Sequence, residues 1–188
     1  MQVLPGCTEA LDWGACRSKV RSRGLAGVFL ASLFGWQRDD GRGRRFRQAF
    51  FTVVRKNGKS TLAAGIAMYM AAIDFNPVSN EPESRSQIIL AATKKEQAEK
   101  VIFAECLRMR HQSKLLKTSS TVANKVITFT HNGGNIQCVG SDRPYDGLNP
   151  QMISLDETHA FSNPHRKFYN TMVTGSGSRV QPLLMTTT

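Results

Sequence analysis

The sequence predicts an α/β protein whose mostly parallel sheet is flanked by helices. Short apolar runs typical of strands alternate along the chain with longer helical patterns, which is the order of a parallel sheet with crossover helices. One of these strand-to-helix junctions carries Gly58-Lys59-Ser60, a phosphate-loop signature. The chain of 188 residues is long enough for one domain with its own core.

The composition excludes two other classes of protein. Hydrophobic residues make up 40% of the chain and charges of both signs are interspersed, which excludes a disordered tail. The longest apolar runs are shorter than the roughly 18 residues that a membrane span needs, so no membrane partner is expected. The formal net charge of +11 favours a polyanionic partner such as nucleic acid.

The expected elements follow from hydrophobic period and turn residues. Helices are expected over 27–36, 59–74 and 164–173. Strands are expected over 48–55, 87–92, 125–129, 136–139, 151–155 and 182–187. A further helix is expected to begin at Thr93, where Thr93 and Glu96 form a T-x-x-E capping box, and residues 131–135 predict a hairpin turn. Residues 1–26 show no clear period and are expected to form an atypical or disordered N-terminal segment.

Positive charge is concentrated before the phosphate-loop signature. The segment 38–47 holds five arginines in ten residues, and two interpretations stay open: a loop that contacts phosphates, or a solvated glycine-rich turn before a strand. The four cysteines show no zinc-binding spacing, which favours reduced thiols in an intracellular setting.

The segment Arg55-Lys56-Asn57-Gly58-Lys59-Ser60-Thr61 has the features of a loop that binds nucleotide phosphates. Gly58 permits close approach of the backbone, and the N–H groups of the following helix start point at the anion. Lys59 would neutralise β/γ-phosphate charge, and the Ser60 hydroxyl would ligate Mg²⁺. Valine at position 53 replaces the usual first glycine, so the alternative is a basic turn with a helix start at Ser60.

Two carboxylates follow the apolar run 152–155. At a strand end beside the phosphate loop, Asp156 would organise Mg²⁺ and Glu157 would polarise the attacking water. A solvated strand end is the alternative for this pair alone. Because the pair lies downstream of Gly58-Lys59-Ser60 in an α/β pattern, the two motifs together predict a P-loop ATPase.

Three weaker candidates remain. The hydroxyl-rich strand end at residues 186–188 could sense the γ-phosphate, or could simply be β-branched strand sequence. Arg143 and Arg179 are candidates for an arginine that neutralises the transition state in cis or in trans, and the alternative for each is a solvated loop arginine.

Several motifs in order resemble the ATPase domain of tailed-phage terminase large subunits, over about residues 27–188. They are Phe34-Gly35-Trp36, Arg45-Phe46-Arg47, the segment 55–61, Ala91-Ala92-Thr93, Gln97-Ala98, Asp146-Gly147-Leu148-Asn149-Pro150, Asp156-Glu157-Thr158-His159-Ala160-Phe161, and Gln181-Pro182-Leu183-Leu184 leading to Thr186-Thr187.

The resemblance implies a P-loop NTPase core of the ASCE type, partial and incomplete at the C-terminus. The family continues into a nuclease domain, so no nuclease activity is expected here. It also implies ATP hydrolysis with Mg²⁺ that drives double-stranded DNA into a procapsid. The implied partners are the portal protein, the small terminase subunit and further copies of the chain in a ring, in the cytoplasm of a bacterial host.

By motif, the resemblance assigns roles to individual residues. Residues 55–61 belong to the nucleotide loop, Ser60 and Asp156 to the metal site, and Glu157 is the catalytic carboxylate. Thr186 and Thr187 would couple hydrolysis to motion.

Two alternatives to an active packaging ATPase stay open. One is an inactive prophage remnant that binds nucleic acid or nucleotide without turnover. The other is a helicase-like P-loop fragment, since Asp156-Glu157-Thr158-His159 superficially resembles a DEAH-like box, although Arg55-Lys56-Asn57 and residues 146–150 argue against it.

Overall fold

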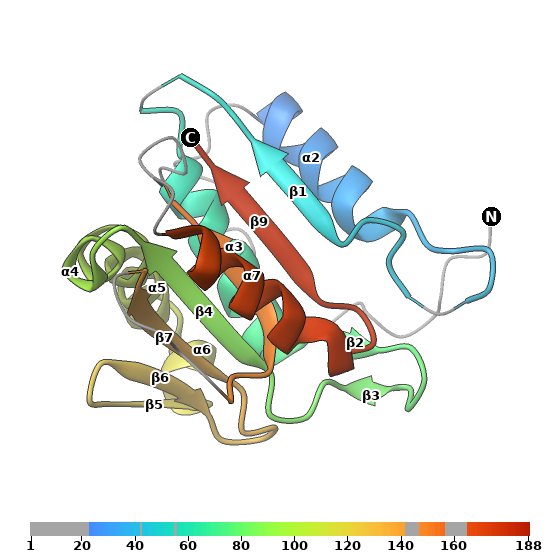
Figure 1. Cartoon of the computed structure of the whole chain (residues 1–188). Coiled ribbons are helices and arrows are strands. Elements are labelled where there is room, and N and C mark those ends of the chain that lie inside the picture. The colour runs from blue at the N-terminus through green and yellow to red at the C-terminus, as the bar shows by residue number, and fades with distance from the viewer. Residues whose placement is uncertain (1–22, 42, 55, 142–146, 157–164) are drawn as a thin grey trace.

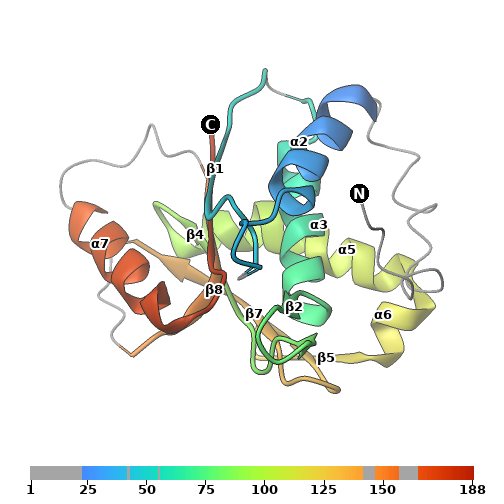
Figure 2. The ribbon, with the colours of Figure 1, turned by 90° about the vertical axis from the view of Figure 1, so that its right-hand side faces the viewer.

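The fold is built on one seven-stranded sheet with helices on both faces (Figures 1 and 2). This computed structural model describes residues 23–41, 43–54, 56–141, 147–156 and 165–188. The strand order is β1-β9-β8-β4-β7-β6-β5. Neighbours from β1 to β7 run parallel, and the β7–β6 and β6–β5 pairs are antiparallel.

The sheet strands and the short hairpin beside them have the following bounds. They are β1 (Gln48–Phe51), β2 (Phe75–Asn76), β3 (Glu81–Pro82), β4 (Gln87–Ala92), β5 (Ser120–Ala123), β6 (Val126–Phe129), β7 (Asn135–Gly140), β8 (Pro150–Leu155) and β9 (Leu183–Thr187). β2 and β3 pair only with each other.

The helices have the following bounds. They are α2 (Arg23–Gly35), α3 (Lys59–Ala72), α4 (Lys95–Ala98), the π-helical turn η1 (Glu99–Phe103), α5 (Ala104–Gln112), α6 (Lys114–Thr118), α7 (His165–Gly175) and the 3₁₀ turn η3 (Ser176–Ser178). No helix among the described residues is long and apolar enough to cross a membrane.

The core has two parts because the strands bury both faces. Ile88 and Leu90 of β4 pack into the larger cluster with α2, α3 and α5, whereas Ile89 and Ala91 pack into the smaller cluster beneath α7. Figure 2 shows α7 alone on one side of the sheet and α2, α3 and α5 on the other. Alternate side chains of a strand point to opposite faces, so a nearly continuous apolar run such as β4 fits between two helical layers.

The predicted α/β class and the mostly parallel sheet are confirmed. The predicted hairpin turn over 131–135 lies between β6 and β7, and it has a second role at the end of α3. Asn132 Nδ2 donates to Ala71 O at 2.9 Å, and His131 Nε2 lies 2.6 Å from Ala72 O. A Cβ on Gly134 would lie 2.0 Å from Ala71 O, so only glycine fits this close approach.

The predicted capping box at Thr93 is wrong. α4 begins at Lys95, its N-cap is the extended Lys94, and no side chain caps it. The Thr93 hydroxyl instead donates to Gln97 Oε1 at 3.0 Å. Because the backbone is still extended at Lys94, the helix begins too late for Thr93 to be the cap.

Other boundaries differ by a few residues. The strand expected over 48–55 ends at Phe51, since its partner β9 ends at Thr187 opposite it. The sequence gives no strong alternation for the edge strand β5, and β2 and β3 lie in a segment expected to be a loop.

Candidate functional site

Five parallel strands end at the same edge of the sheet, which we call the carboxyl edge. They are β1, β9, β8, β4 and β7, and the connection from β1 into α3 crosses this edge. Figure 1 shows the C-terminal end of the described chain beside the end of β1 and the start of α3. In open α/β sheets, ligands bind outside the carboxyl ends of the strands.

The connection before α3 adopts a conformation that favours glycine. Gly58 has φ +74°, a left-handed value, and serves as the N-cap of α3 without any side-chain hydrogen bond. Lys56 is also left-handed, with φ +69°. No side chain at the N-cap position therefore accepts from the first N–H groups of α3. A helix start that binds phosphate needs such uncapped N–H groups.

Lys59 points across this edge toward β9. Its Nζ donates to Val53 O at 3.1 Å and to Thr188 O at 2.7 Å. Val53 O is a neutral peptide oxygen, so a phosphate would replace it with a stronger charge-assisted hydrogen bond to the same ammonium. Lys59 thus connects the phosphate loop with the end of β9.

Asp156 lies directly after β8 and is oriented by β9. The Thr187 hydroxyl donates to Asp156 Oδ1 at 2.8 Å, and the Asp156 N–H donates to Ala91 O at 3.0 Å. Thr187 is 1% exposed, whereas Asp156 is half-buried. The Thr187 hydroxyl of β9 therefore holds one carboxylate oxygen of Asp156 in place at the carboxyl edge.

The two predicted coupling residues lie on opposite faces of β9. Thr187 shares its face with Leu183 and Met185, which pack into the larger core cluster. Thr186 shares the other face with Leu184, on the α7 side. Of the two, the structure connects Thr187 to Asp156.

Thr61 contacts another helix. Its hydroxyl donates to Glu105 Oε2 at 3.3 Å, and the Arg108 guanidinium also pairs with that carboxylate. Ser60 is half-buried one position earlier, at the helix start. Lys56 and Asn57 are exposed in the loop. Sequence reasoning missed Glu105, which has no motif to mark it.

Three predicted residues, Arg55, Arg143 and Glu157, lie outside the described residues. Arg179 lies at the opposite edge of the sheet, before β9, where it donates to Asn149 O at 3.1 Å and pairs with Glu83 at 2.8 Å. The structure therefore does not bring Arg179 together with Lys59 within one chain.

A buried polar network occupies this opposite edge, which we call the amino edge. Asp74 follows α3 and accepts from Arg44 NH1 and from Gln151 Nε2, both at 2.8 Å. Arg44 N–H donates to Gln181 Oε1 at 3.1 Å. All four side chains are at most 5% exposed. Burial raises the pKa of Asp74 above its usual value, although the Arg44 guanidinium acts in the opposite direction.

This network connects the three elements that carry the site. Asp74 follows α3, Gln151 lies in the first part of β8 and Gln181 precedes β9. A predicted site residue lies in or next to the other end of each of these elements. The network therefore fixes how α3, β8 and β9 lie relative to one another. In the sequence, the residues of this network stand out only as polar residues next to apolar runs, and no motif predicts that they meet.

Two of the four described arginines in the segment 38–47 pair with a carboxylate. Arg44 is buried in the network, Arg38 pairs with Asp40 at 2.9 Å, and Arg45 lies over the ring of Trp36. Arg45 and Arg47 are exposed and form no ion pair with a described residue, so a loop that contacts phosphates and a solvated turn both stay open.

The donor set at the carboxyl edge fits Mg²⁺ better than a transition metal. Among the described residues, no group of three or more His, Cys, Asp or Glu side chains gathers around one point. Asp156 and Ser60 offer hard oxygen donors, and Mg²⁺ is commonly held by one or two carboxylates together with substrate phosphates and water.

The strand order, the glycine-dependent loop before α3 and the acid after β8 define a P-loop type of α/β fold. Residues 27–188 match the sequence model of the terminase large subunit ATPase domain. The chain belongs to this family, as the motifs predicted.

Individual relatives agree with this assignment. The large terminase subunit of Enterobacteria phage HK97 is 27% identical over 140 residues, which are 73% of this chain and 26% of that protein. The crystal structure of the HK97 large terminase superposes with a TM-score of 0.71 at 22% identity, covering 88% of this chain and 32% of the other. This chain thus spans about a quarter to a third of these relatives.

Two further phage proteins share the fold. The large terminase ATPase domain of Thermus phage P74-26 has a TM-score of 0.56 at 16% identity, covering 84% of this chain and 67% of that one. The large terminase of a thermophilic bacteriophage, solved in complex with ADP, has a TM-score of 0.54 at 16% identity, covering 84% of this chain and 37% of the other.

Proposed function

We propose that this chain binds ATP with Mg²⁺ at the carboxyl edge and hydrolyses it, as the ATPase portion of a motor that packages double-stranded DNA into a procapsid. The observation that carries the proposal is the contact set at one edge: Lys59 with the end of β9, and Thr187 with Asp156. Three separate elements supply these residues, and family membership supports the activity.

The residues divide the chemistry among them. The left-handed Gly58 and the start of α3 present N–H donors to the phosphates, and Lys59 neutralises their charge by exchanging its backbone acceptors for phosphate oxygens. Asp156 and the Ser60 hydroxyl hold Mg²⁺, which when bound neutralises charge that develops on the phosphates. Glu157, the next residue after Asp156, accepts the proton of the attacking water.

Thr187 is the better candidate for coupling hydrolysis to motion. Its hydroxyl senses the position of the Asp156 carboxylate, and the Lys59 contact lies one residue later at Thr188. A change at the phosphates would therefore alter hydrogen bonds made by the end of β9. Thr186, on the α7 face, would act only through the packing of that helix.

The proposed partners follow from the family. They are double-stranded DNA, the portal protein, the small terminase subunit and further copies of this chain in a ring, in the cytoplasm of a bacterial host. An arginine supplied in trans within such a ring is a proposed role for Arg143 or Arg179; the amino-edge location of Arg179 rules against a cis role.

Steady-state ATP hydrolysis by the full chain tests the proposal. We expect turnover in the wild type and its loss in Glu157→Gln, because glutamine cannot accept the proton. Glu157→Gln should still bind an ATP analogue, since the phosphate-binding residues are intact. Nucleotide binding without turnover in the wild type would support the remnant alternative, and displacement of a strand from a partial duplex would support the helicase alternative.

A further inference from the structure

The first turn of α3 carries the N–H groups that a phosphate would use. Leu62 N–H donates to Gly58 O at 2.9 Å, which is the first hydrogen bond of the helix. The N–H groups of Lys59, Ser60 and Thr61 precede this bond and have no partner within the helix. A contact that fixes the direction of this turn therefore also fixes the direction of these three donors.

The helix α5 packs against this turn. The Thr61 hydroxyl donates to Glu105 Oε2 at 3.3 Å. In the next turn of α3, Ala64 O accepts from the Cys106 thiol at 3.9 Å, and Cys106 is fully buried. Figure 2 shows both helices on the same side of the sheet. Because the neighbour of Glu105 is packed in the core, the carboxylate has a defined place beside the start of α3.

Arg108 also holds the Glu105 carboxylate. Its Nε donates to Glu105 Oε2 at 3.0 Å, and its NH2 group donates to the same oxygen. A carboxylate near a helix start is favoured by the helix dipole, but it would repel a phosphate that binds there. Because the guanidinium neutralises the carboxylate, Glu105 can orient Thr61 without adding net negative charge beside the phosphate loop.

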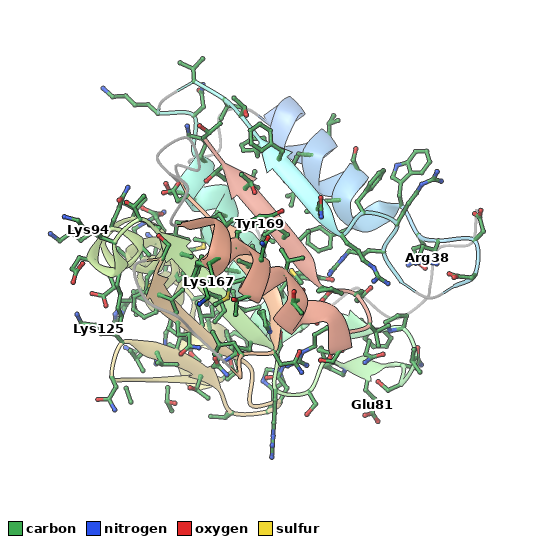
Figure 3. The ribbon with its side chains drawn as sticks, in the orientation of Figure 1. Arg38, Glu81, Lys94, Lys125, Lys167 and Tyr169 are labelled. Carbon is green, nitrogen blue, oxygen red and sulfur yellow. The ribbon has the colours of Figure 1, made fainter. Side chains whose placement is uncertain are left out.

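The helical segment 95–112 changes its hydrogen-bonding pattern just before Glu105. The π-helical η1 ends at Phe103, directly before α5. A π turn closes its hydrogen bonds over five residues, which rotates the side chains that follow, and such turns frequently occur at functional sites. Glu99, at the start of this turn, pairs with Lys125 at 2.7 Å. Figure 3 shows Lys125 at the tip of the β5–β6 hairpin, so the two glutamates of one helical segment serve different neighbours.

We propose that Glu105 is a positioning residue for nucleotide binding. Its carboxylate orients Thr61, and with it the first turn of α3, while Arg108 neutralises the carboxylate beside the phosphates. Glu105 acts through Thr61 and not by contact with the nucleotide. The inference rests on the proposed function, because it gives Glu105 a part in ATP binding at the same site.

Calorimetric titration of the full chain with a non-hydrolysable ATP analogue and Mg²⁺ tests this role. Glu105→Ala is expected to bind about three- to tenfold more weakly, the range for loss of one hydrogen bond. Glu105→Gln keeps an acceptor for the Thr61 hydroxyl and should bind like the wild type. The matched control is Glu99→Ala, which removes the other ion-paired glutamate and should also bind like the wild type.

A double-mutant cycle tests whether Glu105 acts through Thr61. Thr61→Val should weaken binding as much as Glu105→Ala, and the double variant should be no weaker than either, because both changes remove one hydrogen bond. Arg108→Ala should also weaken binding, because it leaves the carboxylate unneutralised. Adding Glu105→Gln to Arg108→Ala removes that charge and should restore binding.

Other results would overturn the inference. Wild-type affinity in Glu105→Ala would do so, and so would equal losses in Glu105→Ala and Glu99→Ala, which would show a general loss of stability. Additive losses in the cycle would exclude action through Thr61. A loss in Arg108→Ala that Glu105→Gln does not relieve would assign Arg108 to phosphate contact and refute its neutralising role.

Two measurements separate these results from other failures. Urea unfolding of the same samples shows whether each variant is folded, and Thr61→Val tests the same hydrogen bond from the other side if Glu105→Ala is not. A wild type that binds no analogue would contradict the proposed function itself. A wild type that binds, together with an unaffected Glu105→Ala, would contradict only the role of Glu105.

Discussion

Replacing Thr187 by valine removes one hydroxyl and keeps the shape of the side chain. That hydroxyl donates to Asp156 Oδ1 at 2.8 Å from a side chain that is 1% exposed. A hydrogen bond to a charged group is worth about 1.5–3 kcal/mol. Asp156 is only half-buried, so water replaces part of the lost donor and the lower end of this range applies.

About 1.4 kcal/mol corresponds to a tenfold change in an equilibrium constant. We therefore expect Thr187→Val to require about tenfold more Mg²⁺ for binding of an ATP analogue, measured by titrating Mg²⁺ against a fixed protein and nucleotide mixture. The free energy of unfolding should change by less than about 1 kcal/mol, since an isosteric apolar group fills the same buried space.

Two matched variants complete this experiment. Thr187→Ser keeps the hydroxyl and should behave like the wild type toward Mg²⁺. Thr186→Val changes the same residue type on the α7 face and should leave the Mg²⁺ requirement unchanged. A Thr187→Val protein with wild-type Mg²⁺ dependence, or a serine variant as impaired as the valine variant, would refute the positioning of Asp156 by this hydroxyl.

Three further predictions concern the scaffold. Asp74→Asn leaves the buried Arg44 without its counter-ion and should lower the free energy of unfolding by about 3–5 kcal/mol in urea titration. Gly134→Ala should strongly lower the free energy of unfolding, because the new Cβ would lie 2.0 Å from the backbone oxygen of Ala71 in α3. Gly27 lies within α2 and a Cβ there would meet no neighbouring atom, so Gly27→Ala should raise the free energy of unfolding by about 0.5–1 kcal/mol. Burial raises the pKa of Cys138 to about 12, so this thiol should resist alkylation near pH 8 in the folded protein and react in urea, as read by peptide mass spectrometry.

A specific result would contradict each of these scaffold predictions. The exposed Arg38–Asp40 pair is the control for the buried one, and Asp40→Asn should cost at most about 1 kcal/mol. Equal costs at Asp74 and Asp40 would show that burial of the ion pair does not matter. A stabilised Gly134→Ala variant, or rapid alkylation of folded Cys138, would contradict the close contact and the burial respectively.

The elements with strong local signals could be predicted from the sequence. β4 is an uninterrupted apolar run, and its predicted bounds match the observed Gln87–Ala92. α3 follows a glycine whose left-handed φ requires that residue. The junction between β1 and α3 was predicted because the motif and its flanking elements are contiguous in the chain.

Contacts between residues far apart in the chain could not be predicted from the sequence. The Thr187 hydroxyl reaches Asp156 across two strands that are parallel neighbours only after folding. Asp74 and Arg44 come from separate loops and meet only when both are buried, so their charges read as surface charges in the sequence. For the same reason, the sequence could not show that Arg44 of the segment 38–47 is buried rather than exposed.

The most direct test of the nucleotide site is calorimetric titration of the full chain with a non-hydrolysable ATP analogue and Mg²⁺. The account predicts binding by the wild type and at least about tenfold weaker binding by Lys59→Ala, which loses a charge-assisted contact to the phosphates. Lys167→Ala, an exposed lysine of α7 on the other face of the sheet, should bind like the wild type. No binding by the wild type, or equal binding by wild type and Lys59→Ala, would contradict it.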